Sequence, residues 1–188
     1  MKPKSNYKVN KLKFNTIDFC ETPYYALYPL LEFIENYNIV WEPATGNGNI
    51  TNELRKVSHT VIDTDIQSGT NFFNYEPANY DIQITNPPFG IKYDWLLRSY
   101  ELNKPFALLL PTETIGAAKA QVLFARFGVQ IIYISKRIDF KMPNKGWNGT
   151  GAQFSTAWFT YKLNLPKDMV FFNLDKPNKT DIIKYYEI

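Results

Sequence analysis

Three polar segments of this chain contain residue types suited to chemistry, and each follows an apolar run. The first, residues 42–48 (EPATGNG), follows the run 38–42. Its glycines, Gly46 and Gly48, allow a tight turn and a close approach of the backbone to a ligand. The second contains Asp65, placed about 20 residues later, where an acid can accept hydrogen bonds from ribose hydroxyls. Asp63 is the alternative acid, and an ordinary strand-to-helix turn with a capped strand end would look similar.

The third segment, Asn86-Pro87-Pro88-Phe89, follows the apolar run 80–85. Asn-Pro and Pro-Pro pairs form turns in many proteins. A plain turn does not require an aromatic side chain directly after two prolines. Ligands of parallel sheets bind at the carboxyl ends of the strands. We therefore predict that this turn belongs to a binding site.

Strands and helices must hold these segments at one edge of a sheet. Thr22-Pro23 predicts a helix start, with Thr22 as N-cap, and Pro29 should kink or restart that helix. Alternating patterns predict an α/β fold, with a mostly parallel sheet and helices on both faces. The short Gly/Asn-rich connection before the final strand predicts one antiparallel strand. The predicted strands are 38–42, 59–64, 80–85, 105–110, 130–135 and 154–162, and the predicted helices are 49–57, 93–102 and 113–126.

Composition excludes several classes of protein. A chain of 188 residues with 45% hydrophobic and 21% charged residues is not mainly disordered, collagen-like or a coiled coil. No apolar run approaches the roughly 18 residues of a membrane span, and the polar start is no secretory signal, so we expect a cytoplasmic protein without a membrane partner. The single Cys20 and single His59 exclude a disulfide and a cysteine or histidine metal site. A net charge of +3 permits a nucleic-acid partner.

The domain organisation follows from length and local composition. Residues 1–15 hold five lysines and form either a solvated tail or an arm that contacts phosphates. Residues 16–165 are predicted to form a single domain, and 166–188 a C-terminal extension.

The order of the motifs resembles a known family. Glu-Pro-x-x-Gly-x-Gly, then an acid after the second strand, then Asn-Pro-Pro-Phe, is similar to the AdoMet-dependent amino-methyltransferases, and among these to small phage-type DNA adenine methyltransferases. The resemblance runs from about residue 16 to 162 and implies a Rossmann-like class I fold with a seven-stranded mixed sheet. Further matching positions are Thr22-Pro23, Asp65-Ile66, Asn71-Phe72 (with Asn where the family has Asp), Leu109-Leu110-Pro111 and Arg137-Ile138-Asp139-Phe140.

The resemblance implies S-adenosyl-L-methionine (AdoMet) as cofactor and methylation of the N6 amino group of adenine in DNA. The catalytic positions are Asn86, Pro87, Pro88 and Phe89. The Asn86 side-chain oxygen and the Pro87 carbonyl would accept the two amino hydrogens, and Phe89 would stack on an extruded base. Cofactor contacts are implied for Thr22, Pro23, Glu42, Pro43, Ala44, Gly46, Gly48, Asp65, Ile66, Asn71, Phe72 and Asn86.

One segment outside the predicted strands and helices is a candidate for contacting the substrate. The segment 136–153 interleaves cations with aromatics, which suits a nucleic-acid strand, although a solvated loop is the alternative. Its candidate contacts, beside Phe89, are Arg137, Lys141, Lys145 and Trp147. The chain has no room for a recognition domain, so a protein partner or a homodimer is expected to contribute. Alternatives to DNA are adenine in RNA, glutamine in a protein, or a catalytically silent AdoMet-binding subunit.

Overall fold

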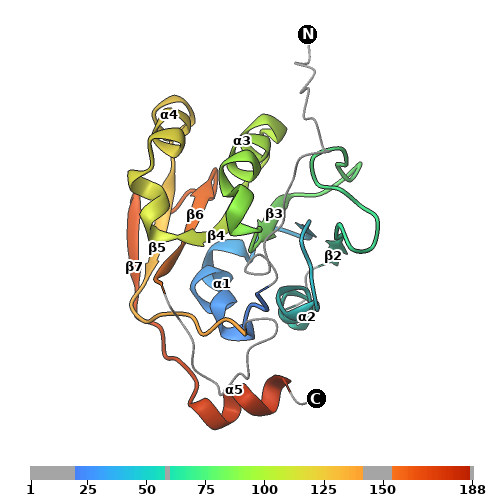
Figure 1. The fold of residues 1–188 in the computed structure, drawn as a ribbon, viewed down its shortest axis with the longest axis vertical. Coiled ribbons are helices and arrows are strands. Elements are labelled where there is room, and N and C mark those ends of the chain that lie inside the picture. The colour runs from blue at the N-terminus through green and yellow to red at the C-terminus, as the bar shows by residue number, and fades with distance from the viewer. Residues whose placement is uncertain (1–19, 58–59, 142–153, 187–188) are drawn as a thin grey trace.

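The computed structural model describes residues 20–57, 60–141 and 154–186. Its centre is a seven-stranded sheet with the order β2-β1-β3-β4-β6-β5-β7 (Figure 1). Only β6 runs against its neighbours, so the predicted mixed sheet with one antiparallel strand is confirmed. The strands are β1 (Ile39–Glu42), β2 (Thr60–Asp63), β3 (Ile82–Thr85), β4 (Phe106–Pro111), β5 (Gln130–Ile134), β6 (Thr156–Tyr161) and β7 (Met169–Phe172).

The central strands are buried on both faces, which explains why they are continuous apolar runs without alternation. Ala107 and Leu109 of β4 face a core formed with η3 (Tyr24–Leu30), α1 (Leu31–Ile34) and α2 (Asn49–Lys56). Leu108 and Leu110 face the opposite core, covered by α3 (Lys92–Leu102) and α4 (Ala118–Phe127). Helices therefore cover both faces, as predicted, and Figure 1 shows α3 and α4 beside each other.

The first helix differs from the prediction. Thr22 is not its N-cap, because the chain enters a 3-10 helix, η3, at Tyr24 with the extended Pro23 before it. The Thr22 hydroxyl instead binds another side chain, described below. Pro29 lies inside η3, and the α-helical turn of α1 starts only after it, at Leu31. The expected restart after the proline is therefore observed, since a proline disrupts the α-helical hydrogen bonds before it.

The predicted helix 113–126 is two elements. A 3-10 turn, η5 (Thr112–Gly116), precedes α4, and the extended Ala117 separates them. The helical pattern of the sequence is continuous across this break because both elements place apolar residues against the same core: Ile115 of η5 packs against the core that buries Ala120 and Phe124 of α4.

The segment 166–188, expected as an extension, contributes two elements. β7 pairs in parallel with β5 and supplies the seventh strand of the sheet, for which no sequence candidate was identified. The helix α5 (Lys179–Tyr186) lies below the sheet in Figure 1 and buries Ile182 in the core shared by η3, α1 and α2. Residues beyond 165 thus take part in the sheet and in its main core.

Candidate functional site

A cavity of about 350 Å³ opens where β1, β2 and β3 end, which is the edge at which parallel sheets bind ligands. Among the predicted site residues it is lined by Thr22, Pro43, Ala44, Gly46, Asp65, Ile66, Asn71, Phe72, Asn86 and Pro88. The other predicted residues that the structure describes are not in this lining. They are Pro23, Glu42, Gly48, Pro87, Phe89, Arg137 and Lys141.

The turn after β1 depends on its two glycines. Gly46 and Gly48 have φ angles of +50° and +83°, in the left-handed region where residues with a Cβ are strained. Gly48 directly precedes the first residue of α2 and is not part of the cavity lining, whereas Gly46 lines the cavity. Space is open around Gly46, so its backbone conformation, and not crowding, is what requires glycine.

Glu42 is completely buried beneath this turn. Its Oε1 accepts a hydrogen bond from the Ala44 N–H at 3.1 Å, and Oε2 makes none with any described residue. Burial raises the pKa of Glu42 to about 8, and the nearby Thr85 hydroxyl, although not in hydrogen-bond geometry, and the Ala44 N–H lower it only in part. Glu42 therefore supports the turn that holds Ala44, and does not itself form the cavity surface.

Asp65 links the ends of β1 and β2. Its Oδ2 accepts the Gly46 N–H at 3.0 Å and its Oδ1 accepts the Gln67 N–H at 2.7 Å. Each carboxylate oxygen can accept a second hydrogen bond, so the side chain retains acceptor capacity toward the cavity that it lines. The alternative acid, Asp63, is exposed and pairs with Arg55 at 2.6 Å, away from the cavity lining.

An aromatic cluster forms one wall. Phe72 stacks on Trp95 with ring centroids 3.9 Å apart and an interplanar angle of 7°. Both residues line the cavity, as does the half-exposed Ile66. Asn71 closes the turn before Phe72, with its Oδ1 accepting the Phe73 N–H at 3.0 Å. An apolar wall of this kind suits a flat ring, and the amide of Asn71 lies beside it.

Asn86 is held by a residue far away in the sequence. Its Nδ2 donates to the Thr22 Oγ1 at 2.9 Å, and the Thr22 carbonyl in turn accepts a hydrogen bond from Asn49 at 3.0 Å. The Asn86 Oδ1 is buried and makes no hydrogen bond to any described residue. A buried amide oxygen without a partner is costly, and this one belongs to a residue that lines the cavity.

The other residues of the Asn-Pro-Pro-Phe turn differ in whether they line the cavity. Pro88 lines it, whereas Phe89 begins the short turn η4 (Phe89–Ile91) beside it. The Phe89 ring lies nearly perpendicular to Phe154, at 5.4 Å, and to Phe140, at 6.1 Å. These rings fix the orientation of Phe89, because edge-to-face pairs are favourable and specific in geometry.

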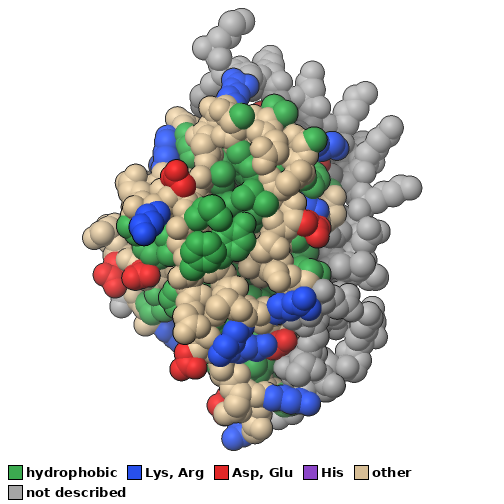
Figure 2. All heavy atoms as spheres, turned by 90° about the vertical axis from the view of Figure 1, so that its left-hand side faces the viewer, with side chains coloured by type: hydrophobic (Ala, Val, Ile, Leu, Met, Phe, Trp, Pro, Cys, Tyr) green, Lys and Arg blue, Asp and Glu red, His purple; other side chains and the backbone are tan. Residues whose placement is uncertain are grey.

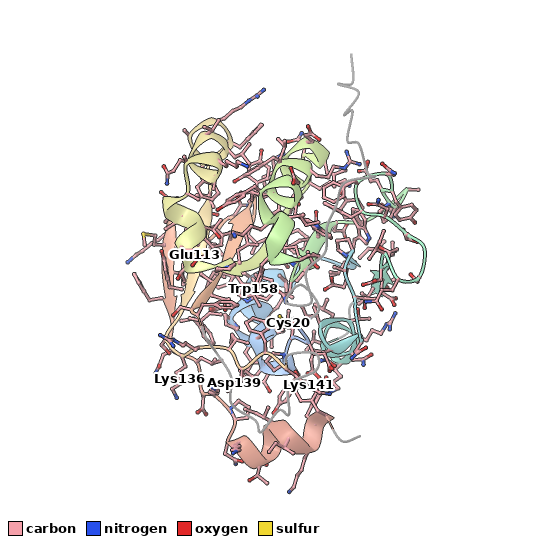
Figure 3. The ribbon with its side chains drawn as sticks, viewed as in Figure 1. Cys20, Glu113, Lys136, Asp139, Lys141 and Trp158 are labelled. Carbon is pink, nitrogen blue, oxygen red and sulfur yellow. The ribbon has the colours of Figure 1, made fainter. Side chains whose placement is uncertain are left out.

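The segment that contains Lys141 reaches the cavity rim indirectly. Glu21 and Lys141 form an antiparallel bridge with two backbone hydrogen bonds, and their side chains pair at 3.2 Å. The Lys141 ammonium also lies 5.0 Å from the centre of the Tyr186 ring. Figure 3 shows Lys141 and Asp139 on one segment below the sheet, with Cys20 nearby. Lys141 therefore holds the rim residues Cys20 and Glu21, while Arg137 is exposed.

Other predicted residues fall outside the described part of the chain. They are Lys145, Trp147, His59 and the arm 1–15. Conversely, several cavity residues were not anticipated. Trp95 carries a detectable signal, being an aromatic residue on a predicted helix, but its position toward the cavity depends on how α3 packs. The remaining ones are Cys20, Glu21, Thr45, Asn47, Asn49, Ile50, Gln67, Thr70, Phe73 and Ile91.

Two kinds of site are absent from the described residues. They contain no cluster of His, Cys, Asp and Glu able to hold a metal ion. No helix in this part of the chain has both the length and the apolar character that a membrane crossing needs.

The fold matches that of methyltransferases of known structure. The methyltransferase subunit of a type I restriction-modification system from Streptococcus thermophilus has a TM-score of 0.50 and 15% identity over 87% of this chain and 50% of its own. A modification subunit assigned to a type I restriction enzyme from Vibrio vulnificus YJ016 has a TM-score of 0.51 and 12% identity over 88% and 48%.

The chain thus has the predicted Rossmann-like methyltransferase fold, and spans about half the length of these two subunits. No protein-family model matches the sequence, and no curated protein sequence does either.

Proposed function

We infer that the chain is an AdoMet-dependent methyltransferase that acts on the exocyclic N6 amino group of adenine in DNA. The observation that carries this proposal is the Asn86 side chain. Its Oδ1 is a buried acceptor without a described partner, and it belongs to a cavity that also contains the Asp65 carboxylate. In such a site the carboxylate can bind the ribose of a nucleoside-type ligand, and the amide oxygen can bind an amino group.

The cavity residues fit AdoMet. Asp65 has acceptor capacity left for ribose hydroxyls, and the Gly46 turn lets the backbone approach closely. Ile66 and the Phe72–Trp95 pair provide an apolar wall for the adenine ring, with Asn71 at its edge. AdoMet, when bound, supplies a methyl group activated by its sulfonium sulfur.

The chemistry expected of the protein residues is polarisation of the amine. An exocyclic amine on a purine is a poor nucleophile because its lone pair is delocalised into the ring. The Asn86 Oδ1 accepts one amino hydrogen, and the Pro87 carbonyl accepts the other. Thr22 holds the Asn86 amide at 2.9 Å, so this acceptor is oriented before the substrate arrives, and the two prolines stiffen the turn that carries the Pro87 carbonyl. Holding both reactants in one cavity supplies the remaining acceleration.

The choice of DNA rests on the fold neighbours. Both are named as methyltransferase or modification subunits of type I restriction systems, and we take DNA as the substrate class that fits these names. Because the chain spans about half of their length, we propose that target recognition comes from another chain or from regions beyond the cavity. Adenine in RNA, a protein glutamine and a silent AdoMet-binding subunit are the outcomes against which the proposal is tested.

The test is methyl transfer from radiolabelled AdoMet to separate pools of DNA, RNA and protein, followed by nucleoside mass spectrometry. We expect N6-methyladenine in DNA, and a loss of on the order of a hundredfold or more in turnover for Asn86→Ala with cofactor binding retained. Asn52→Ala, at an exposed position of α2 outside the cavity lining, serves as a matched control and should keep its activity. Full turnover by Asn86→Ala, or label only in RNA or protein, would contradict the proposal.

A further inference from the structure

The edge of the sheet farthest from the cavity exposes apolar side chains. Of the six large hydrophobic side chains that are exposed in the described residues, three lie on β7 and α4: Met169, Phe171 and Val122. Phe171 is 77% exposed and stacks on Tyr133 of β5, 5.6 Å away. Figure 2 views the molecule from this side and shows a hydrophobic patch at the centre of the face. A patch on a soluble domain of this kind commonly marks an interaction site.

The backbone of β7 is also unpaired on its outer side. The Asp168 carbonyl accepts the Ile131 N–H and the Phe172 carbonyl accepts the Ser135 N–H, so even-numbered residues point their polar backbone groups at β5. The N–H and C=O groups of Met169 and Phe171 therefore point away from the sheet. No described strand pairs with them, since β7 is the last strand of the sheet.

The strand contains none of the residue types that commonly protect a sheet edge from pairing. Its four residues, Met169–Phe172, contain no charge and no proline. Natural edge strands usually carry a lysine, a proline or a bulge, because an unprotected edge is a template for another strand. An edge that is both apolar and unpaired favours a partner strand.

The charges that flank β7 have opposite signs at its two ends, so two copies of β7 in an antiparallel arrangement would bring opposite charges together. Lys167 precedes Phe171 by four residues and Asp175 follows it by four. If Phe171 lies opposite Phe171 of a second copy and the pairing continues beyond both ends of β7, each Lys167 comes opposite an Asp175. Both side chains are exposed, and neither makes an ion pair with another described residue.

We propose that β7 is an isologous interface on which a second copy of this chain adds its own β7 antiparallel, joining two sheets across a two-fold axis. In this register the outward backbone groups of Phe171 pair with each other, and the two Phe171 side chains lie on the same face. The two cavities stay open, because they lie beside β1, β2 and β3 at the other end of the sheet.

The test is sedimentation equilibrium of the full chain over a range of concentrations. We expect wild type to show twice the 21.9 kDa mass of the chain. Phe171→Lys should weaken the dimer by at least about a hundredfold, since both copies lose a central aromatic contact and gain a charge. Val57→Lys, which changes an exposed apolar residue outside this face, is the matched control and should leave the dimer unchanged. Dimers unaffected by Phe171→Lys would overturn the proposal.

A charge exchange tests the register and the identity of the partner. Lys167→Asp and Asp175→Lys should each weaken the dimer, by roughly threefold to tenfold, and their combination in one chain should restore it. Restoration is expected only if both charges come from copies of the same chain; its failure overturns the register. A wild-type chain that stays monomeric at every concentration overturns the dimer itself. Cofactor affinity should be unchanged throughout, so this result is independent of the proposed function.

Discussion

At the β2 side of the sheet, carboxylates and amides hold loop backbones, whereas at the β7 side apolar side chains meet solvent. The cavity depends on polar contacts across the chain, such as Asp65 to Gly46 and Asn86 to Thr22. The far edge also has polar contacts, such as those of Gln130 with Leu165 and of Ser135 with Leu174, but its outermost strand presents Phe171, which packs on Tyr133 and is 77% exposed. The difference supports two separate proposals, that one edge orients a small ligand and that the other pairs with a second copy of the chain.

The largest expected effect concerns Glu42, which supports the cavity edge from below. Its pKa is raised by burial to about 8 from 4.5, so the folded state binds a proton more tightly than the unfolded state. This contribution to stability is fully present below about pH 4.5 and is lost as the pH rises through about 8. Relative to Glu42→Gln, wild type should lose on the order of a few kcal/mol of unfolding free energy across this window.

Urea unfolding of both proteins at several pH values between 4.5 and 9 measures this difference. The exposed Glu32→Gln is the control and should follow the wild-type profile. A gap between wild type and Glu42→Gln that stays constant with pH would show that Glu42 is ionised in the folded protein.

The next effect concerns Asp65. Asp65→Ala should weaken AdoMet binding at least about tenfold, because a charge-assisted hydrogen bond contributes roughly 1.5–3 kcal/mol. Calorimetry measures the affinity, and Asp63→Ala is the matched control, since Asp63 pairs with Arg55 outside the cavity. Equal affinities for the two variants would remove the ribose role from Asp65. Because Asp65 also holds Gly46, circular dichroism must show that the variant remains folded.

A smaller effect is expected where Thr22 holds Asn86. Thr22→Val removes the hydroxyl that accepts the Asn86 amide at 2.9 Å and keeps a similar shape. Turnover should fall about tenfold, by the value of one hydrogen bond in a buried site. Thr22→Ser keeps the hydroxyl and should recover most of the rate. If Thr22→Val lowers cofactor affinity with kcat unchanged, Thr22 binds the cofactor and does not orient Asn86.

The two edges also differ in how far the sequence predicted them. The polar segments at the cavity edge are short and local, and 42–48, Asp65 and Asn86 all gather there because parallel strands end at one edge. β7 has no comparable signal, because four residues after a polar stretch carry too little pattern to distinguish a strand from a loop.

Local sequence patterns also could not predict the contacts between segments that are distant in the chain. Thr22 resembled a helix cap, yet its hydroxyl binds Asn86, 64 residues away. Glu42 stands in a motif of cavity residues but lies beneath the turn, since its side chain follows the inward direction of a buried strand. Such placements depend on how the elements pack and not on their local spacing.

The smallest effect concerns Lys141, which connects the cavity rim with the C-terminal helix. Its ion pair with Glu21 is partly exposed, so a double-mutant cycle of Lys141→Met and Glu21→Gln should give a coupling of about 0.2–1 kcal/mol in unfolding free energy. Because Glu21 lines the cavity, Lys141→Met should also weaken cofactor binding by a few fold.

A phosphate contact of Lys141 would behave differently. Its loss would reduce the log–log salt slope of DNA binding by about 0.7–0.9 and leave cofactor affinity unchanged. The exposed Arg137→Met is the comparison variant, expected to leave cofactor affinity unchanged. A changed salt slope of DNA binding, with no coupling to Glu21, would show that Lys141 contacts the substrate and does not support the cavity rim.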